Sequence, residues 1–458
     1  PFLSMGCIQR GEDEAKEIAG RFRRKDFSGN EGQAIKNSSF LLSTTLVAKI
    51  GSLLFAIVIA RMLMPELFGL YSLALGTIVL FAGFSDFGIS SAMVTFVAKS
   101  LGKKAPKKAK AYFSKTIRMK VWMVAIATLV LLASAYFVAT NYYNKPIFYA
   151  LLVGGLYLPI SSFLGFFDGI FRAMNKFQYL LIKEIVFQFL RFSLVPLSIF
   201  FLLKANVGNE LLIAAIIFIL AICLGISLLV FVFLAKRKVP FINEKRTRLS
   251  SGEKKNMNKF IWPITLTVLS GAFFGYIDTI MLGHFVDGQF IGYYAAAFSL
   301  VASAAAIISF SSGALFPIFA RLKGKQLETG FRKTRLLTVL ISLAAAIVTF
   351  LLAKYVILLA YGKDYLTAVP ILQIFALFVL IGPIIGLYDT YFVSQERTKI
   401  IAFLLIITTA INIGLNWVFI TYGLQFGMYE ALIGAASATL ISRGLYLLGL
   451  GFAKRFRR

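Results

Sequence analysis

The basic residues of this chain fall on alternate sides of its apolar segments, and this pattern restricts the possible folds more than any other feature. Twelve apolar stretches are each long enough to cross a bilayer. Of the 48 Lys and Arg residues, 40 lie before the first stretch, in or beside every second connection, or after the last stretch. Short loops rich in Lys and Arg remain in the cytoplasm. We therefore predict an all-α polytopic protein of the cell membrane, with twelve transmembrane helices and both termini cytoplasmic.

The longest basic connection, 236–259, divides the predicted spans into six and six. It separates a six-helix bundle predicted at 37–235 from a second six-helix bundle predicted at 260–453. Residues 1–36 are predicted to form a cytoplasmic N-terminal tail, and 454–458 a basic cytoplasmic tail. The predicted spans are 37–62, 67–98, 121–140, 146–171, 178–203, 211–235, 260–283, 289–320, 336–360, 366–393, 400–422 and 429–453. Ser250 and Glu253 have the spacing of a capping box, which predicts the start of a helix leading into the seventh span.

Composition argues against several other classes of protein. The chain is 59% hydrophobic with a mean hydropathy of +0.81, far above the values of soluble domains. Its net charge of +28 lies mainly in loops that the positive-inside rule requires to be basic. We therefore expect anionic lipid of the inner leaflet as a partner, and no nucleic acid. Two Cys and one His give no disulfide framework and no His-based metal site. No Walker A or Rossmann glycine pattern occurs in a strand–helix context, so we expect neither a cofactor nor an enzymatic activity.

The two predicted halves resemble each other where their first two spans meet. PELFGLYSLA at 65–74 joins spans one and two, and GQFIGYYAAA at 288–297 joins spans seven and eight. Three positions are identical at an offset of 223 residues, namely Gly69/Gly292, Tyr71/Tyr294 and Ala74/Ala297. Because each half has an even number of spans, such repeats are parallel and related by an axis along the membrane normal. Two bundles of this kind would enclose a central cavity.

Several charged residues lie deep within predicted spans, where each costs about 2.5–3.5 kcal/mol on insertion scales. Such residues either face a cavity or pair with one another, as Asp86 could with Lys49. Three of them are cations, and Arg and Lys form charge-assisted bonds to phosphate, so a cavity for an anionic headgroup is predicted. The deep residues are Lys49, Asp86, Arg191, Asp278, Asp389 and Arg443, and Arg61 lies near the outer end of span one.

Four stretches resemble the polysaccharide and O-antigen flippases of the multidrug/oligosaccharidyl-lipid/polysaccharide (MOP) exporter superfamily. ARMLMPELFGLYSLA at 60–74 resembles their signature ARxLGPExFGxYSLA, with Met64 in place of the usual Gly. The other three are FSDFGI at 84–89, YIDTIMLG at 276–283 followed by IGYYAAA at 291–297, and YGKDYLTAVPILQIFAL at 361–377. With the twelve predicted spans, the similarity covers about 35–455.

The resemblance implies the fold of multidrug and toxin extrusion (MATE) transporters, in which two six-helix bundles form a V around a cavity and access alternates between its two sides. Related lipid II flippases bind pyrophosphate with basic cavity residues, one of them on the first span. Lys49 and Arg61 are the first-span candidates here. Asp86 and Asp278 lie within matched motifs.

We interpret the sequence as that of a flippase for a polyprenyl-phosphate- or pyrophosphate-linked oligosaccharide, with glycan assembly enzymes as further partners. Two alternatives remain, a cation-coupled multidrug exporter of the same fold and a membrane glycosyltransferase or polymerase. A surplus of carboxylates in the cavity would favour the exporter. The predicted substrate-binding residues are Lys49, Arg61, Asp86, Arg191, Asp278 and Arg443, and the predicted ion-coupling residues are Asp86, Asp278 and Asp389.

Overall fold

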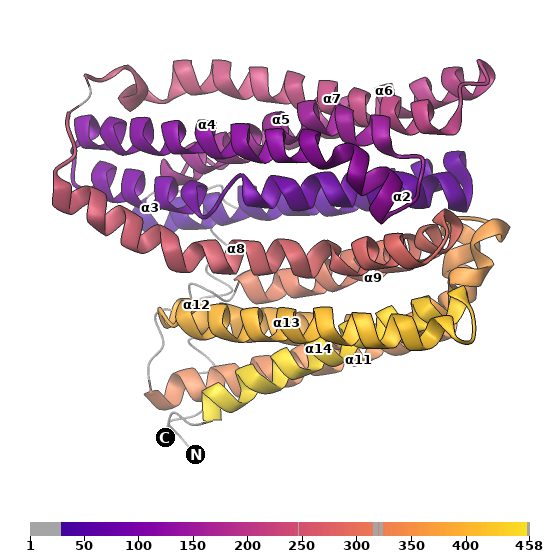
Figure 1. Ribbon diagram of the computed structural model, residues 1–458. Coiled ribbons are helices and arrows are strands. Elements are labelled where there is room, and N and C mark those ends of the chain that lie inside the picture. The colour runs from indigo at the N-terminus through magenta and orange to yellow at the C-terminus, as the bar shows by residue number, and fades with distance from the viewer. Residues whose placement is uncertain (1–28, 246, 315–318, 320–323, 456–458) are drawn as a thin grey trace.

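The computed structural model describes residues 29–245, 247–314, 319 and 324–455. These residues form long helices joined by short connections, and no β-strand occurs among them (Figure 1). The N-terminal half contains α2 (Gly29–Phe84), α3 (Ile89–Gly102), α4 (Pro106–Tyr136), the π-helix η1 (Phe137–Tyr142), α5 (Phe148–Ala173), α6 (Gln178–Lys204) and α7 (Asn209–Lys238).

The C-terminal half follows a short 3-10 helix, η2 (Pro240–Asn243), in the basic linker. It contains α8 (Ser251–Phe285), α9 (Gly288–Ala314), α11 (Gly324–Ala360), the 3-10 helix η3 (Lys363–Ala368), α12 (Val369–Ser394), α13 (Thr398–Leu424) and α14 (Met428–Arg455). In Figure 1 the helices run side by side, and α8 and α9 lie between the other helices of the two halves. Ser250 caps α8 as predicted, because its hydroxyl accepts from the Glu253 N–H and the Glu253 carboxylate accepts from the Ser250 N–H.

The helices occupy the predicted spans, with differences at two places. Span two was predicted to be continuous over 67–98, but the helix stops at Phe84 and resumes at Ile89. Phe87 (φ 42°) and Gly88 (φ 71°) form a left-handed turn in this break, and a Cβ at Gly88 would lie 2.9 Å from the Ile264 side chain of α8. The first helix begins at Gly29, before the predicted start of the first span, whereas its apolar part begins at Ser39. Residues 1–28 and 456–458 lie outside the described ranges. Helix α9 is described as far as Ala314, and most of the predicted end of span eight, 315–320, is likewise outside these ranges.

The helices are suited to a membrane in length and composition. Among the described residues, ten helices are long and apolar enough to cross one, or eleven if the bent pair within α8 forms a single span. Helix α2 is counted once among the ten. A kink at Met64 (φ 60°, ψ 170°), directly before Pro65, divides it into the first predicted span and the start of the second. The count of twelve spans stays a prediction.

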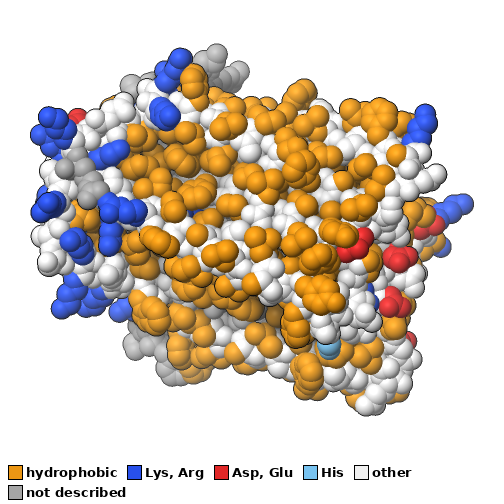
Figure 2. Space-filling model, turned by 45° about the horizontal axis from the view of Figure 1, so that its top comes forward, with side chains coloured by type: hydrophobic (Ala, Val, Ile, Leu, Met, Phe, Trp, Pro, Cys, Tyr) orange, Lys and Arg blue, Asp and Glu red, His pale blue; other side chains and the backbone are white. Residues whose placement is uncertain are grey.

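Charged side chains mark the two ends of the molecule. Lys and Arg gather at one end, apolar side chains cover the middle, and several carboxylates lie at the other end (Figure 2). We call the first the basic end; it carries the α3–α4, α5–α6, α7–α8 and α12–α13 connections. The other, the opposite end, carries the α4–α5, α6–α7, α8–α9, α11–α12 and α13–α14 connections. The positive-inside rule predicts that the basic end is cytoplasmic.

The buried apolar residues form one shared core at the opposite end and two separate cores at the basic end. The shared core draws on both halves and includes Ile59, Leu73, Ile213, Tyr294 and Ile371. At the basic end, the N-terminal half has a core that includes Phe113, Phe166 and Phe231. The C-terminal half has its own, which includes Phe331, Tyr388 and Leu450. The halves therefore adhere at the opposite end and diverge toward the basic end.

Candidate functional site

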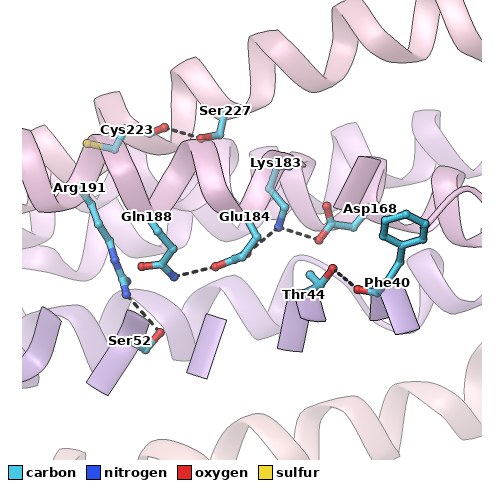
Figure 3. A network of polar contacts seen from close by, with 10 residues as sticks. All are labelled: Phe40, Thr44, Ser52, Asp168, Lys183, Glu184, Gln188, Arg191, Cys223 and Ser227. Atoms are coloured by element: carbon cyan, nitrogen blue, oxygen red, sulfur yellow. Dashed lines mark hydrogen bonds and ion pairs between the residues drawn. The ribbon is translucent and has the colours of Figure 1, made fainter. Parts of the chain in front are cut away.

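A chain of polar side chains runs along α6 from its middle toward the basic end (Figure 3). Lys183 Nζ forms ion pairs with Asp168 Oδ2 of α5 at 3.2 Å and with Glu184 Oε2 at 3.3 Å. Glu184 Oε1 accepts a hydrogen bond from Gln188 Nε2 at 2.7 Å. Gln188 packs directly on the backbone of α2 at Gly51, where a Cβ would lie 2.5 Å from the Gln188 amide. One cation and two carboxylates leave this part of the chain with a negative formal charge, and their contacts fasten α5, α6 and α2 to one another.

Arg191 continues the chain at the middle of α6, where it interacts electrostatically with Glu184 but forms no ion pair with it. Its Nη2 donates to Ser52 Oγ at 3.3 Å, and its guanidinium lies 4.4 Å from the ring centre of Phe55 and 5.1 Å from that of Phe187. Arg191 is 8% exposed, and its Nε is buried without a hydrogen-bond partner in the described part of the chain. No described carboxylate lies within ion-pair distance of it. A guanidinium with an unfilled donor suits an anionic ligand.

Lys49 lies on α2 one helical turn before Ser52, which is the hydroxyl partner of Arg191. Its side chain is exposed, and no described residue forms an ion pair or hydrogen bond with it. Its position brings a second cation to the same stretch of α2, so two of the predicted substrate-binding residues lie near each other.

Asp86 lies in the break of the second span and is paired. Its Oδ1 is 2.8 Å from Lys120 Nζ of α4 and also accepts from the Ser90 hydroxyl. Lys120 is only 2% exposed, and it, rather than Lys49, is the partner of Asp86. Thr265 of α8 donates to the Phe87 carbonyl at 2.8 Å, so the break also contacts the C-terminal half. The ion pair fastens the interrupted helix to α4.

Asp278 is the centre of a buried polar network in the C-terminal half. Its carboxylate accepts from Tyr294 of α9 at 2.8 Å, from Asn416 of α13 at 2.7 Å and from Thr439 of α14 at 2.5 Å. Asn412 adds a bond to Thr439 at 3.2 Å. Asp278 is 6% exposed, and four helices thus converge on one carboxylate whose hydrogen-bonding partners are all neutral.

Arg443 and Asp389 extend this network toward the basic end. Arg443 of α14 interacts electrostatically with Asp278 and Asp389, and its guanidinium is 5.7 Å from the ring centre of Phe378. Asp389 of α12 accepts from the Tyr446 hydroxyl at 2.9 Å. Two deep carboxylates and one cation leave this network with a negative formal charge.

Arg61 is separated from these networks and ties the two halves together at the opposite end. Its Nε donates to the Ala360 carbonyl at 2.8 Å, and its Nη2 to the Leu359 carbonyl, at the C-terminal end of α11. A cation is favourable there because the last carbonyls of a helix carry partial negative charge. The Tyr365 hydroxyl, in η3, donates to the Ala60 carbonyl at 2.9 Å.

The two repeated segments cross each other at the same end. A Cβ at Gly69 would lie 1.8 Å from the Gly288 carbonyl oxygen, and one at Gly292 would lie 2.0 Å from the Pro65 carbonyl oxygen. Since 65 and 69 become 288 and 292 at the repeat offset of 223, the two contacts are equivalent. Backbone touches backbone here because neither glycine has a side chain.

At the basic end the described contacts between the halves come from α8. Lys108 of α4 forms an ion pair with Glu253, and Thr265 donates to the Phe87 carbonyl. With the separate basic-end cores, this arrangement is closed at the opposite end and parted at the basic end.

Comparison with known proteins identifies the family. The model of the polysaccharide biosynthesis protein family matches residues 34–323, well over half of the chain. The chain belongs to this family. The MatE family model matches residues 263–418 of this polysaccharide biosynthesis family member. No curated protein sequence matches the chain.

Solved structures of low sequence identity share the fold of this family member. The lipid II flippase MurJ, in an inward closed conformation, has a TM-score of 0.66 and 16% identity over 92% of this chain and 87% of that chain. An inward-facing multidrug resistance MATE family transporter has a TM-score of 0.65 and 15% identity over 92% of this chain and 96% of that chain. A MOP superfamily transporter from Pyrococcus furiosus, reported with a binding pocket of reverse polarity, has a TM-score of 0.61 and 14% identity over 93% of this chain and 96% of that chain. The predicted MATE-like fold is confirmed, and the long apolar helices show a multi-pass membrane protein.

Several residues of these networks were not among the predicted site residues. Lys120 was assigned to a basic loop because it directly precedes span three. Asn412 and Asn416, four residues apart in an apolar span, were a usable signal, since paired amides on one face of a membrane helix need internal partners. Tyr294 was noted as part of the repeat, and Thr439 carried no signal.

Proposed function

We propose that this protein moves a polyprenyl-phosphate- or pyrophosphate-linked oligosaccharide from the cytoplasmic to the outer leaflet by alternating access. Arg191 carries the proposal. It is a guanidinium at the middle of α6 whose Nε donor is unfilled. The charged side chains that precede it in the polar network of α6 form ion pairs with one another. Phosphate oxygens would fill that donor, and Lys49 would add a second positive charge one turn from Ser52. The prenyl tail would stay in the lipid.

The membrane potential is the proposed driving force. A pyrophosphate group carries about two negative charges, and moving one charge through 100 mV is worth about 2.3 kcal/mol. With the cell interior negative, outward transfer would gain roughly 4–5 kcal/mol per 100 mV. On this proposal Arg191 admits the anion, and Arg61 belongs to the closure at the opposite end rather than to the phosphate site.

A cation-coupled exporter of drug-like molecules is the second candidate, and the network around Asp278 favours it. Carboxylate and amide oxygens are ligands for hard cations. Asn412 Oδ1 and Asn416 Oδ1 are buried beside that network without hydrogen-bond partners in the described part of the chain. Asp278, Asp389 and Arg443 together leave a net negative charge that a sodium ion or proton would balance.

Reconstituted vesicles separate the two candidates. We expect a potassium–valinomycin potential alone to accelerate flipping of a fluorescent polyprenyl-pyrophosphate glycan, without a sodium or pH gradient. Arg191→Gln should weaken binding of that glycan by about tenfold or more, since a hydrogen bond to a charged group contributes about 1.5–3 kcal/mol. Binding of the dephosphorylated glycan should be unchanged. Arg237→Gln is the matched control, because Arg237 also stacks on a phenylalanine, 4.3 Å from the Phe233 ring centre, but at the basic rim.

The opposite outcome is equally clear. The flipping rate could instead be independent of the potential, rise with a sodium or proton gradient, and be lost in Asp278→Asn. That result would show that transport is coupled to a cation and is not driven by the potential. Transport of drug-like cations, without any binding of the phosphorylated glycan, would show that the protein is an exporter of drug-like molecules and not a flippase.

Export also requires the predicted orientation. Single cysteines at Asn144, Asn206 and Asp364, at the opposite end, should react with an impermeant thiol reagent added to intact cells. Cysteines at Gly102 and Ser251, at the basic end, should not. The reverse pattern would invert the direction of transport.

A further inference from the structure

An apolar groove opens on the outer surface of the C-terminal half, between the start of α13 and the end of α14. It has a volume of about 680 Å³, within the range of sites that hold small molecules. Its apolar lining includes Phe403 and Leu404 of α13 and Leu445, Leu448, Gly449 and Phe452 of α14. Gly449 lets the two helices approach, since a Cβ there would lie 2.9 Å from the Leu404 side chain. Phe403, Leu448 and Phe452 are 64%, 70% and 64% exposed, as expected of side chains that face lipid.

The groove spans one leaflet. At 1.5 Å per residue, Leu445 lies about 15 Å from Arg455, the last described residue of α14. This is about half of the roughly 30 Å hydrocarbon thickness of a bilayer. Both helices meet the basic end here, so the groove extends from the headgroup level at the basic end to the middle of the membrane.

Positive charge rims the groove at the headgroup level. Lys399 is itself a lining residue, and Arg397 and Arg455 lie at the adjoining ends of α13 and α14. None of the three has a carboxylate partner among the described residues, whereas nearby Lys454 is bound to Glu328 at 2.5 Å. Even with Glu396 in the same connection, the local surplus is positive. Basic pockets between membrane helices on the cytoplasmic side bind anionic lipid headgroups.

The groove does not communicate with the polar interior. Leu445, Leu448 and Phe452 face outward, while Ser442, Tyr446 and Leu450 are buried on the other face of the same helix. Tyr446 uses that inner face to donate to Asp389. A chain in the groove would therefore hold its headgroup on the far side of α14 from the networks of Arg191 and Asp278, which argues for a resident lipid and against transported cargo.

We infer that this groove binds an anionic glycerophospholipid of the basic-end leaflet, with one acyl chain between α13 and α14 and its phosphate at Lys399. The inference is independent of the substrate proposed above. The bound lipid would fill the seam between the last two helices, both of which contribute to the Asp278 network.

Native mass spectrometry of the full-length protein tests this site, with phosphatidylglycerol and phosphatidylcholine of identical chains as probes. We expect the wild type to retain phosphatidylglycerol in preference. Lys399→Gln should reduce that preference about five-fold, since a basic residue near an anionic headgroup contributes about 1 kcal/mol. Lys333→Gln, an exposed lysine on α11, should leave it unchanged.

A second variant tests the groove itself. Ala453→Phe places a ring in the lining and should abolish retention of both lipids, whereas Ala344→Phe, on a lipid-facing part of α11, should not. Equal retention of the two lipids by the wild type would refute the inference, as would unchanged preference in Lys399→Gln. Displacement of phosphatidylglycerol by equimolar polyprenyl phosphate would instead make the groove a cargo site. A monodisperse elution profile identifies folded variants, and either variant alone decides the outcome.

Discussion

Gly292→Ala should shift the conformational balance of the transporter. The new Cβ would lie 2.0 Å from the Pro65 carbonyl oxygen, so α9 and α2 would have to separate by about 1 Å at a backbone contact that no rotamer change can relieve. Overpacking of this kind costs about 1–3 kcal/mol. The contact belongs to the state closed at the opposite end, so the cost falls on that state. The equilibrium should move by roughly 5–150-fold toward states that part the halves there.

Spin labels at Asn144 and Asp364, which lie at the opposite end in different halves, report this balance through their distance distribution in nanodiscs. The two native cysteines are removed first. Gly414→Ala is the matched control, because nothing lies within 4 Å of a Cβ at that helical glycine, and alanine improves helix propensity. The control should leave the distribution unchanged. A Gly292→Ala distribution identical to the wild type, in a protein of unchanged thermal stability, would refute the reasoning.

Three further predictions concern the contacts around the sites. Arg61→Gln should populate the longer distances of the same label pair, because two bonds to the α11 carbonyls are lost; an unchanged distribution would show that this tie carries no energy. Lys120→Met should lower the thermal midpoint strongly, since breaking a buried ion pair costs about 3–5 kcal/mol. Adding Asp86→Asn should recover most of that loss, and a double variant no better than the single one would contradict the pairing. Tyr294→Phe should reduce the protection against unfolding that sodium ions or protons give the protein. This protection is measured as the shift of the thermal midpoint with and without the ion, and equal shifts in the wild type and the variant would show that Tyr294 is not part of a cation site.

The architecture was predictable because membrane insertion acts on features that are visible in the sequence. Apolar length and loop charge placed the predicted spans on observed helices. The predicted linker at 236–259 includes the end of α7 and the start of α8, which are separated by 239–250. The break at Ser85–Gly88 was missed because the sequence on both of its sides is apolar and reads as one continuous span, although Ser, Asp and Gly are all common in turns. Its cause is tertiary, since Lys120 and Thr265 satisfy the polar groups that the break exposes.

The deep charges all lie on observed helices or in the break between two of them, but their grouping was not predictable. Sequence position alone does not show that Asp86 selects Lys120, which appeared to belong to a loop. Nor does sequence position show that Arg61 and Lys49 have different contacts, because both lie on the first span and differ only in depth. Asp278 was found through its motif, whereas its partners come from three other helices and depend on the packing of the whole half.

The crossing of the two repeated segments has the form of a contact between identical subunits. Gly69 meets the carbonyl of Gly288 as Gly292 meets that of Pro65, which is the reciprocity of an isologous interface on a two-fold axis. A six-span ancestor that paired as a homodimer would have made this contact with both copies of one segment. Every substitution would then have acted on both sides at once, which restricts the residue at the crossing to glycine. Fusion of two gene copies would release that coupling, and Pro65, which corresponds to Gly288 in the repeat, is a position at which the two segments differ.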